Sequence, residues 1–329
     1  MKIKKVLAVL LIVVMCFVLV ACGDTVGGSE SAGSIPEKEA TNDTAKNDEI
    51  SPLLYKVTDT KGNVAWLFGS IHIGAKRFYP LPDYVLNALD NSDSLAVEFD
   101  IVKYEKDQAA AMEMLAQFVI TDGRTIKDFV SDDVYEAGKK VLTENGYYAP
   151  ALDYYMPIMW SNFIDEFLYQ KIDVNIDLGI DRHLIERAYE KDIEILDVES
   201  AEFQYKMLAG YSKELQALLL KESIDAYNDL ETSKKEFGEM LSVWASGDEK
   251  KFAKILTETE FENEQEKKLY QEYNNAMIIN RNKSMTDWAE NALKSGKEVF
   301  ICVGAAHIVG PGAMAEMLEN RGYTVELVK

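Results

Sequence analysis

Two apolar runs far apart in the chain each lead into the pattern Gly-x-x-His. Residues 64–68 precede Gly69-Ser70-Ile71-His72, and residues 299–303 precede Gly304-Ala305-Ala306-His307. Both runs are continuously apolar rather than alternating, which predicts strands buried on both faces of a parallel sheet. Each is followed by a helical pattern, at 83–91 and 314–320, and then by a further strand, at 94–99 and 323–328. The chain therefore carries two β-loop-α-β units.

A hairpin precedes the first unit, and a long helical segment separates the two. Residues 54–58 and 64–68 flank Asp59-Thr60-Lys61-Gly62-Asn63, whose composition is typical of a turn. From about 102 to 296 helical periodicity dominates, with one apparent strand at 193–198. We expect an α/β fold in which the two β-loop-α-β units form a mixed, largely parallel sheet with a large helical insertion. Because the loops at the carboxyl ends of parallel strands converge, His72 and His307 are predicted to be neighbours at one sheet edge.

The first fifty residues carry a different pattern. Three lysines, an apolar run over residues 6–21 and the stretch Leu19-Val20-Ala21-Cys22 are typical of an export signal. Leu-Val-Ala-Cys resembles a bacterial lipobox, in which the cysteine is lipidated and becomes the first residue of the mature protein. We therefore expect a lipoprotein signal peptide at 1–21, lipidated Cys22 with a flexible polar tether to residue 50, and a folded domain at 51–329. An uncleaved membrane anchor or an ordinary signal peptide is the alternative.

Charge and cysteine content narrow the classes of partner. The 329 residues are 47% hydrophobic, which excludes a disordered protein, and the formal net charge is −21. Such a negative field repels nucleic acid, so no nucleic-acid partner is expected. Cys16 would leave with the signal and Cys22 would carry lipid, which leaves Cys302 without a partner for a structural disulfide.

His72, His307 and Glu98 are the candidate metal ligands. Glu98 interrupts an otherwise apolar run at 95–99 and closes the strand of the first unit. Imidazole and carboxylate ligands suit zinc, iron, cobalt or manganese, whereas thiolate ligation is excluded because Cys302 is alone. A metal with an open position activates water and polarises a carbonyl, which is the chemistry of hydrolysis. The structural alternative is two hydrogen-bonded histidines at strand ends and a solvent-facing Glu98.

Several further stretches carry a resemblance to a known family. They are GSIHIG at 69–74, AVEFD at 96–100, LGID at 178–181, ILDVES at 195–200, Arg281-Asn282, and GAAHIVG at 304–310. Together they resemble the TraB/PrgY/GumN family, which includes the TIKI proteases, and the likeness covers roughly residues 52–329. The resemblance implies an α/β fold with a helical insertion and, for TIKI members, peptide cleavage that depends on manganese or cobalt. It also implies that His72, His307, Glu98, Glu199 and Arg281 occupy the family's site positions.

The sequence allows more than one role for several side chains in and around these motifs. Glu98 is either a metal ligand or a general base, and Arg281 either binds a substrate carboxylate, stabilises an oxyanion or is a solvated helix charge. His183 is predicted to be a surface residue, whereas Asp181 is expected to cap a helix or to support the site. The aromatic side chains between residues 147 and 167 are expected to be mostly helix core, with some lining a cleft for an extended peptide.

These observations favour a membrane-tethered, extracytoplasmic, metal-dependent hydrolase. The expected substrate is a peptide or protein, and the expected contact with the bilayer is the lipid on Cys22. The family also includes members described as inhibitors of peptide pheromone signalling. The alternative is therefore a noncatalytic lipoprotein that sequesters a peptide or a small ligand, haem included, in the same cleft.

The lipobox generates a direct prediction. Cys22→Ser, with the signal otherwise intact, should stop lipid attachment and release the domain from the membrane fraction, because one or two acyl chains would be its anchor. Fractionation with mass spectrometry of the N-terminus measures this. Membrane retention of a signal-cleaved Cys22→Ser protein would contradict the lipoprotein assignment.

Overall fold

Strand β5 (Val299–Gly304), near the C-terminus, occupies the middle of the sheet. The computed structural model describes residues 50–172, 174–258 and 260–328. Within these residues, six strands form one sheet in the order β4-β3-β5-β2-β1-β6. The others are β1 (Leu54–Thr58), β2 (Val64–Ser70), β3 (Ser94–Val97), β4 (Glu194–Asp197) and β6 (Thr324–Leu327).

The pairing of the strands confirms a mixed, largely parallel sheet. β2, β5, β3 and β4 are successively parallel, β1 is antiparallel to β2, and β6 is antiparallel to β1. The predicted hairpin is thus the antiparallel part of the sheet. β3 ends at Val97, earlier than the predicted 94–99, which leaves Glu98 in the loop beyond the strand.

The two β-loop-α-β units are interleaved rather than side by side. β5 inserts between β2 and β3, while β2 and β1 lie between β5 and β6. This arrangement places the carboxyl ends of β4, β3, β5 and β2 next to one another. Residues far apart in sequence therefore meet at this one edge, as expected for parallel strands.

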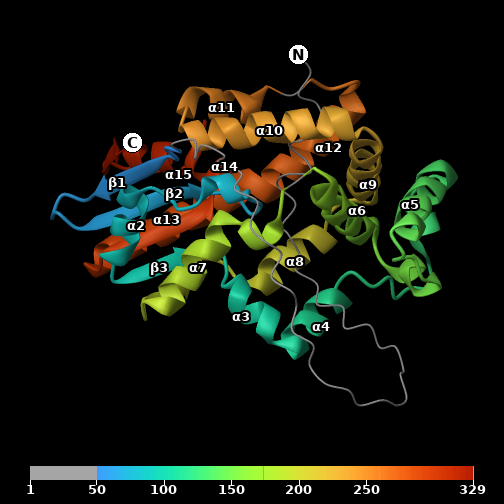
Figure 1. The fold of residues 1–329 in the computed structure, drawn as a ribbon, viewed down its shortest axis with the longest axis horizontal. Coiled ribbons are helices and arrows are strands. Elements are labelled where there is room, and N and C mark those ends of the chain that lie inside the picture. The colour runs from blue at the N-terminus through green and yellow to red at the C-terminus, as the bar shows by residue number, and fades with distance from the viewer. Residues whose placement is uncertain (1–49, 173, 259, 329) are drawn as a thin grey trace, which may run out of the picture.

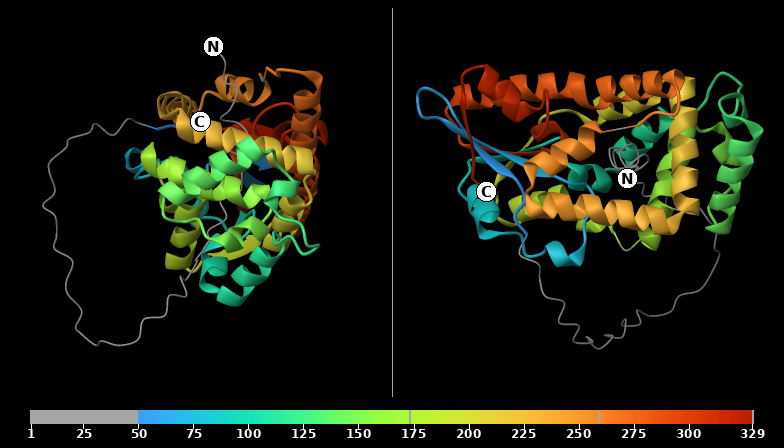
Figure 2. Two further views of the ribbon diagram at one scale, coloured as in Figure 1. Left: turned by 90° about the vertical axis from the view of Figure 1, so that its right-hand side faces the viewer. Right: turned by 90° about the horizontal axis from the view of Figure 1, so that it is seen from above.

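Helices cover both faces of the sheet, as the apolar strands require. α7 (Ile180–Glu190) packs on β3 and β4, whereas α13 (Asn280–Ser295) packs on β2 and β5. In Figure 1 α7 lies in front of the sheet and α13 behind it, and the view from above in Figure 2 agrees. The shorter helices beside the strands are α2 (Asp83–Asp90), α14 (Ala305–Ile308) and α15 (Met314–Asn320).

The predicted insertion thus contributes α7, β4 and α13 to the sheet and its two faces, and its other helices lie above, below and to the right of the sheet in Figure 1. α6 and α9 pack closely together, and the buried indole of Trp160 belongs to this part of the core. The α-helices are α3 (Ile101–Lys106), α4 (Gln108–Ala116), α5 (Asp132–Glu144), α6 (Pro157–Lys171), α8 (Ala201–Ala209), α9 (Lys213–Asn228), α10 (Leu230–Ser246), α11 (Glu249–Thr257) and α12 (Glu264–Asn274). Four 3₁₀ turns, Lys76–Phe78, Ile126–Asp128, Pro150–Tyr154 and Ile176–Leu178, and a π-helical turn, Asn275–Ile279, complete the described elements.

The predicted signal peptide, Cys22 and residues 23–49 of the predicted tether lie outside the described residues. Ile50, which ends the predicted tether, is already buried, and the Ser51 N–H donates to the carbonyl of Ala245 in α10 (2.7 Å). Across the described part of the chain, every helix is too short or too polar to cross a bilayer.

A close backbone contact fixes the loop after β2 against the segment before α7. Gly74 and Asn175 exchange two backbone hydrogen bonds of 2.9 and 3.0 Å, and the Ile180 N–H donates to the carbonyl of Ile71 (2.9 Å). A Cβ atom on Gly74 would lie 1.7 Å from the carbonyl oxygen of Leu178. Glycine is therefore required where these two segments touch.

This contact predicts the effect of adding one methyl group. Gly74→Ala should lower the free energy of unfolding by about 1–3 kcal/mol or more, because the clashing atom is backbone and cannot rotate away. Gly238→Ala is the matched control, since a Cβ there meets no atom within 4 Å in the middle of α10. The control should stabilise the protein by up to about 1 kcal/mol. Urea denaturation of the two variants distinguishes the outcomes, and equal stability would refute the contact.

Candidate functional site

Four neighbouring strands each deliver a polar side chain to the same sheet edge. Glu199 follows β4, Glu98 follows β3, His307 follows β5, and His72 follows β2. The ladder between β3 and β4 continues beyond the strands, because the Glu199 N–H donates to the carbonyl of Glu98 (2.9 Å). The structure therefore brings together the residues that the sequence analysis singled out.

The two Gly-x-x-His motifs need their glycines for different reasons. A Cβ atom on Gly69 would lie 2.9 Å from the Cα atom of Ala305, so the first glycine lets β2 approach the second motif. A Cβ atom on Gly304 would lie 3.2 Å from Glu98 Oε1, 3.6 Å from His307 Cδ2 and 3.9 Å from His72 Nε2. The second glycine therefore keeps open the space between the three candidate ligands.

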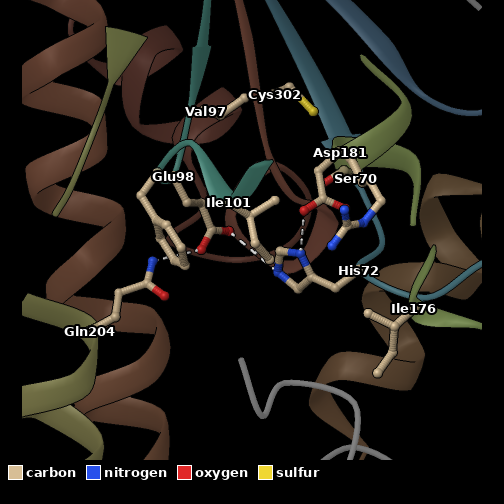
Figure 3. A pocket seen from close by; sticks show the side chains of 11 residues that line it. Ser70, His72, Val97, Glu98, Ile101, Ile176, Asp181, Gln204 and Cys302 are labelled. Atoms are coloured by element: carbon tan, nitrogen blue, oxygen red, sulfur yellow. Dashed lines mark hydrogen bonds and ion pairs between the residues drawn. The ribbon is translucent and has the colours of Figure 1, made fainter. Parts of the chain in front are cut away.

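Glu98 is the centre of the cluster. Its Oε1 accepts from the Gly304 N–H (2.8 Å) and faces the Nε2 atoms of His72 (3.8 Å) and His307 (4.0 Å). Its Oε2 accepts from Arg281 Nη2 (2.6 Å) and from Gln204 Nε2 (3.0 Å). Figure 3 shows this carboxylate between Gln204 and the ring of His72. The predicted solvent-facing alternative for Glu98 is wrong, because the residue is 6% exposed.

Arg281, in the first turn of α13, is buried behind the two carboxylates. The side chains of Arg281, Glu98 and Glu199 are 2%, 7% and 5% exposed. The guanidinium donates to Glu98 and Glu199 and also to the carbonyl of Met277 (3.3 Å), in the π-helical turn that precedes α13. Burial alone would raise the pKa of Glu98, but Arg281 and, less strongly, the two imidazoles hold it well below its usual range. Arg281 is thus not a solvated helix charge.

His72 is held from behind by Asp181. The Nδ1 atom of His72 lies 2.9 Å from Asp181 Oδ2, so the ring presents Nε2 to Glu98. Burial alone would lower the pKa of His72, but the carboxylates of Asp181 and Glu98 outweigh it and raise the pKa to about 9. Helix α7 begins after Gly179 without a side-chain cap, so Asp181 supports His72 rather than capping the helix.

His307 is held in the same way by Asn282, a residue with no separate role in the sequence analysis. Asn282 Nδ2 donates to the carbonyl of Gly312 (2.9 Å), which turns its Oδ1 toward His307 Nδ1 (2.6 Å). Because Oδ1 can only accept, Nδ1 carries the proton and the lone pair of Nε2 faces Glu98. Burial, together with the positive charge of Arg281, lowers the pKa of His307 to about 3. His307 is therefore neutral.

These contacts leave an excess of negative charge and converging lone pairs. Glu98, Glu199 and Asp181 carry three negative charges against the positive charges of Arg281 and protonated His72, so the cluster keeps an excess of one negative charge. The excess is two once His72 gives up its Nε2 proton. The cluster is balanced by protons on the imidazoles or by a divalent cation. Histidine ligands held through their second nitrogen by an oxygen acceptor are the usual arrangement in metal sites.

The distances between the donor atoms are the second test of whether a metal ion fits this cluster. Over residues 50–172, 174–258 and 260–328, no group of three or more His, Cys, Asp and Glu side chains already has metal-binding geometry. Two ligands of one ion with bonds of roughly 2 Å lie about 3–4 Å apart. The 3.8 and 4.0 Å separations are at the outer limit of that range. The donor types, their tautomers and the space at Gly304 fit a divalent ion.

A cavity opens beside the cluster. It encloses about 480 Å³ out to open solvent and is lined by His72, Glu98, Asp181, Gln204 and Cys302, among others. Burial raises the pKa of the Cys302 thiol, which keeps it protonated. His183 is half-buried rather than on the surface, because its ring packs on Tyr79 with centroids 4.6 Å apart. Asp181 and His183 thus face different partners, as their spacing predicted.

Gln204 and Asn282 are the contacts that sequence reasoning did not find. Gln204 is fully buried in α8 and donates to both Glu98 and Glu199 (3.0 Å each). Gln204 lies in the first turns of the helix that follows the ILDVES stretch, and no motif around it indicates a contact with the carboxylates. Asn282 directly follows Arg281 in the stretch that carried the resemblance, and this adjacency is the one available hint.

Comparison with known proteins identifies the family of the chain. Residues 53–327 match the TraB/PrgY/gumN family. Two relatives, each named "Uncharacterized protein YbaP", come from Escherichia coli (strain K12) and Shigella flexneri. Each is 25% identical over 254 residues, which cover 77% of this chain and 86% of the relative. No solved structure matches. Because the family match spans almost the whole described chain, this protein belongs to the TraB/PrgY/gumN family.

Proposed function

We propose that this protein is a metal-dependent hydrolase that cleaves peptides. The observation that carries the proposal is the convergence of three electron-pair donors, His72 Nε2, His307 Nε2 and Glu98 Oε1, each fixed by a separate hydrogen bond. Two imidazoles and a carboxylate form the ligand set that catalytic zinc, iron, cobalt and manganese sites share.

His72, His307 and Glu98 would hold the ion. When bound, a divalent ion lowers the pKa of a water ligand and polarises a substrate carbonyl. The family resemblance favours manganese or cobalt, and the donor types also accept zinc or iron. Glu98 serves better as a ligand than as a general base, because its Oε2 is occupied by Arg281 and Gln204 while its Oε1 faces both imidazoles.

The remaining side chains hold protons and charges in place. Asp181 and Asn282 each hold the proton of an imidazole at Nδ1 and so direct Nε2 toward the ion. Nε2 of neutral His307 is free for a ligand bond, whereas His72 would first give up its Nε2 proton. Arg281 keeps Glu98 ionised and joins it to Glu199. Because the guanidinium is buried among these acceptors, it supports the ligand set instead of contacting a substrate carboxylate or an oxyanion. Glu199 acts through Arg281 and Gln204.

The location follows from the N-terminal sequence. A lipid on Cys22 would anchor the domain to the cell membrane at its extracytoplasmic face, where the substrate would be a peptide or exported protein. Sequestration of a peptide or haem in the same cavity is the competing function, and it differs by predicting binding without cleavage.

Metal content and activity test the shared site. His72→Ala and His307→Ala should each lower bound manganese or cobalt and chelator-sensitive peptide cleavage by more than about 100-fold, since even supporting residues contribute about 10- to 100-fold. The double variant should lose little more, because groups that act as a unit are not additive. Elemental analysis and cleavage of a peptide mixture before and after chelation provide the measurements.

Two further variants sharpen this test. Gly304→Ala keeps all three donors but places a methyl group between them, so it should also expel the ion from a folded protein. His183→Ala, whose ring packs on Tyr79, should retain both metal and activity. Stoichiometric metal in both single histidine variants would refute the shared site. Peptide or haem binding without any chelator-sensitive cleavage would favour sequestration.

The supporting role of Arg281 is tested through stability. Arg281→Met should lower the free energy of unfolding by about 3–5 kcal/mol, because it leaves two buried carboxylates unpaired. Adding Glu199→Gln to Arg281→Met should recover part of the loss. Arg124→Met is the control: it removes an exposed ion pair with Asp122 and should leave the thermal midpoint unchanged. A fully stable but inactive Arg281→Met protein would instead support direct contact with the substrate.

A further inference from the structure

An apolar groove lies next to the cavity beside His72 and Glu98. It runs between α3, α4 and α8 and encloses about 330 Å³ out to open solvent. Phe99 and Ile101 line both the groove and the cavity, and Phe99 directly follows Glu98 in the chain. The two spaces are therefore neighbours that share a wall.

The walls of the groove are aromatic and aliphatic. Phe99 and Tyr104 meet edge to face with ring centroids 5.6 Å apart, and Tyr205 packs on Phe118 at 5.7 Å. Ala111 and Met114 complete the wall on α4. Rings held in this way present a rigid apolar surface, which favours an aromatic or long aliphatic group.

The charge at the groove is already neutralised. Glu105 lines the groove, but both of its carboxylate oxygens accept from Arg182, with Nη1 at 2.8 Å from Oε2. Arg182 in turn lines the cavity beside His72. A bidentate pair of this kind offers little net charge to a ligand, so the groove favours an uncharged side chain.

We infer that this groove is a substrate subsite for one large apolar side chain of the peptide, next to the bond held at His72 and Glu98. The inference rests on the proposed function and specifies its substrate class. The groove's size suits a single side chain rather than a helix, and its shared wall places that side chain within a residue or two of the cleaved bond. Peptides with phenylalanine, tyrosine, leucine or methionine at this position are the expected substrates.

The test compares two blocked peptides, Ac-Ala-Ala-Phe-Ala-Ala-NH₂ and Ac-Ala-Ala-Ala-Ala-Ala-NH₂. Calorimetry with a chelator present measures the affinity of each peptide for the full mature chain in the absence of cleavage. The value of kcat/KM with manganese measures the preference between the peptides during cleavage. We expect the phenylalanine peptide to be favoured by about 10- to 100-fold in both, as for other apolar pockets.

Variants at one position of α4 locate the effect. Ala111→Trp should fill the groove and abolish the preference, and Ala111→Asp should abolish it by adding a charge and far less bulk. Ala116→Trp is the matched control, because Ala116 is exposed on the same helix and does not line the groove, so the preference should persist. Circular dichroism confirms that each variant is folded.

The outcomes separate the subsite from the proposed function. Equal binding of the two peptides, no binding of either, or a preference that survives Ala111→Trp in a folded protein would overturn the subsite. A preference in binding that disappears in Ala111→Trp, without cleavage under any metal, would support the subsite and refute the hydrolase.

Discussion

A carboxylate buried at the end of a central strand must be paired, because an isolated charge in a protein interior costs several kcal/mol. Glu98 is such a group, and its five partners come from four different parts of the chain. Gly304 ends β5 and His307 lies in α14 directly after it, Arg281 comes from α13, Gln204 from α8, and His72 from the loop beyond β2. Satisfying this one side chain therefore fixes how the sheet, the helical insertion and the two Gly-x-x-His motifs meet.

The same pairing makes the two imidazoles unequal. The carboxylates of Asp181 and Glu98 raise the pKa of His72 against the effect of burial, whereas burial, together with the charge of Arg281, lowers the pKa of His307. Asp181 and Asn282 give both rings the same orientation despite this difference.

The helical insertion contributes more than cover for the sheet. α8 supplies Gln204 to the carboxylates and Tyr205 to the apolar groove, and α13 supplies Arg281 and Asn282. The aromatic residues at the groove are Phe99, Tyr104 and Tyr205, and the aromatic residues between 147 and 167, expected to be mostly helix core, do not line it. Variation in α4 would therefore change the groove without disturbing the cluster at the sheet edge, whereas α8 contributes to both.

The sequence by itself determined the strands, the hairpin and the residues of the two motifs. Continuous apolar runs indicate strands that are buried on both faces of a sheet. A charged residue in such a run, as at Glu98, indicates that a partner from another part of the chain must pair with it. The nature of that interaction was decided by tertiary structure, since Arg281 and Gly304 reach Glu98 across 183 and 206 residues. Periodicity describes only near neighbours along the chain. For this reason the interleaved strand order, the burial of Arg281 and the contacts of Gln204 and Asn282 depend on how distant segments pack.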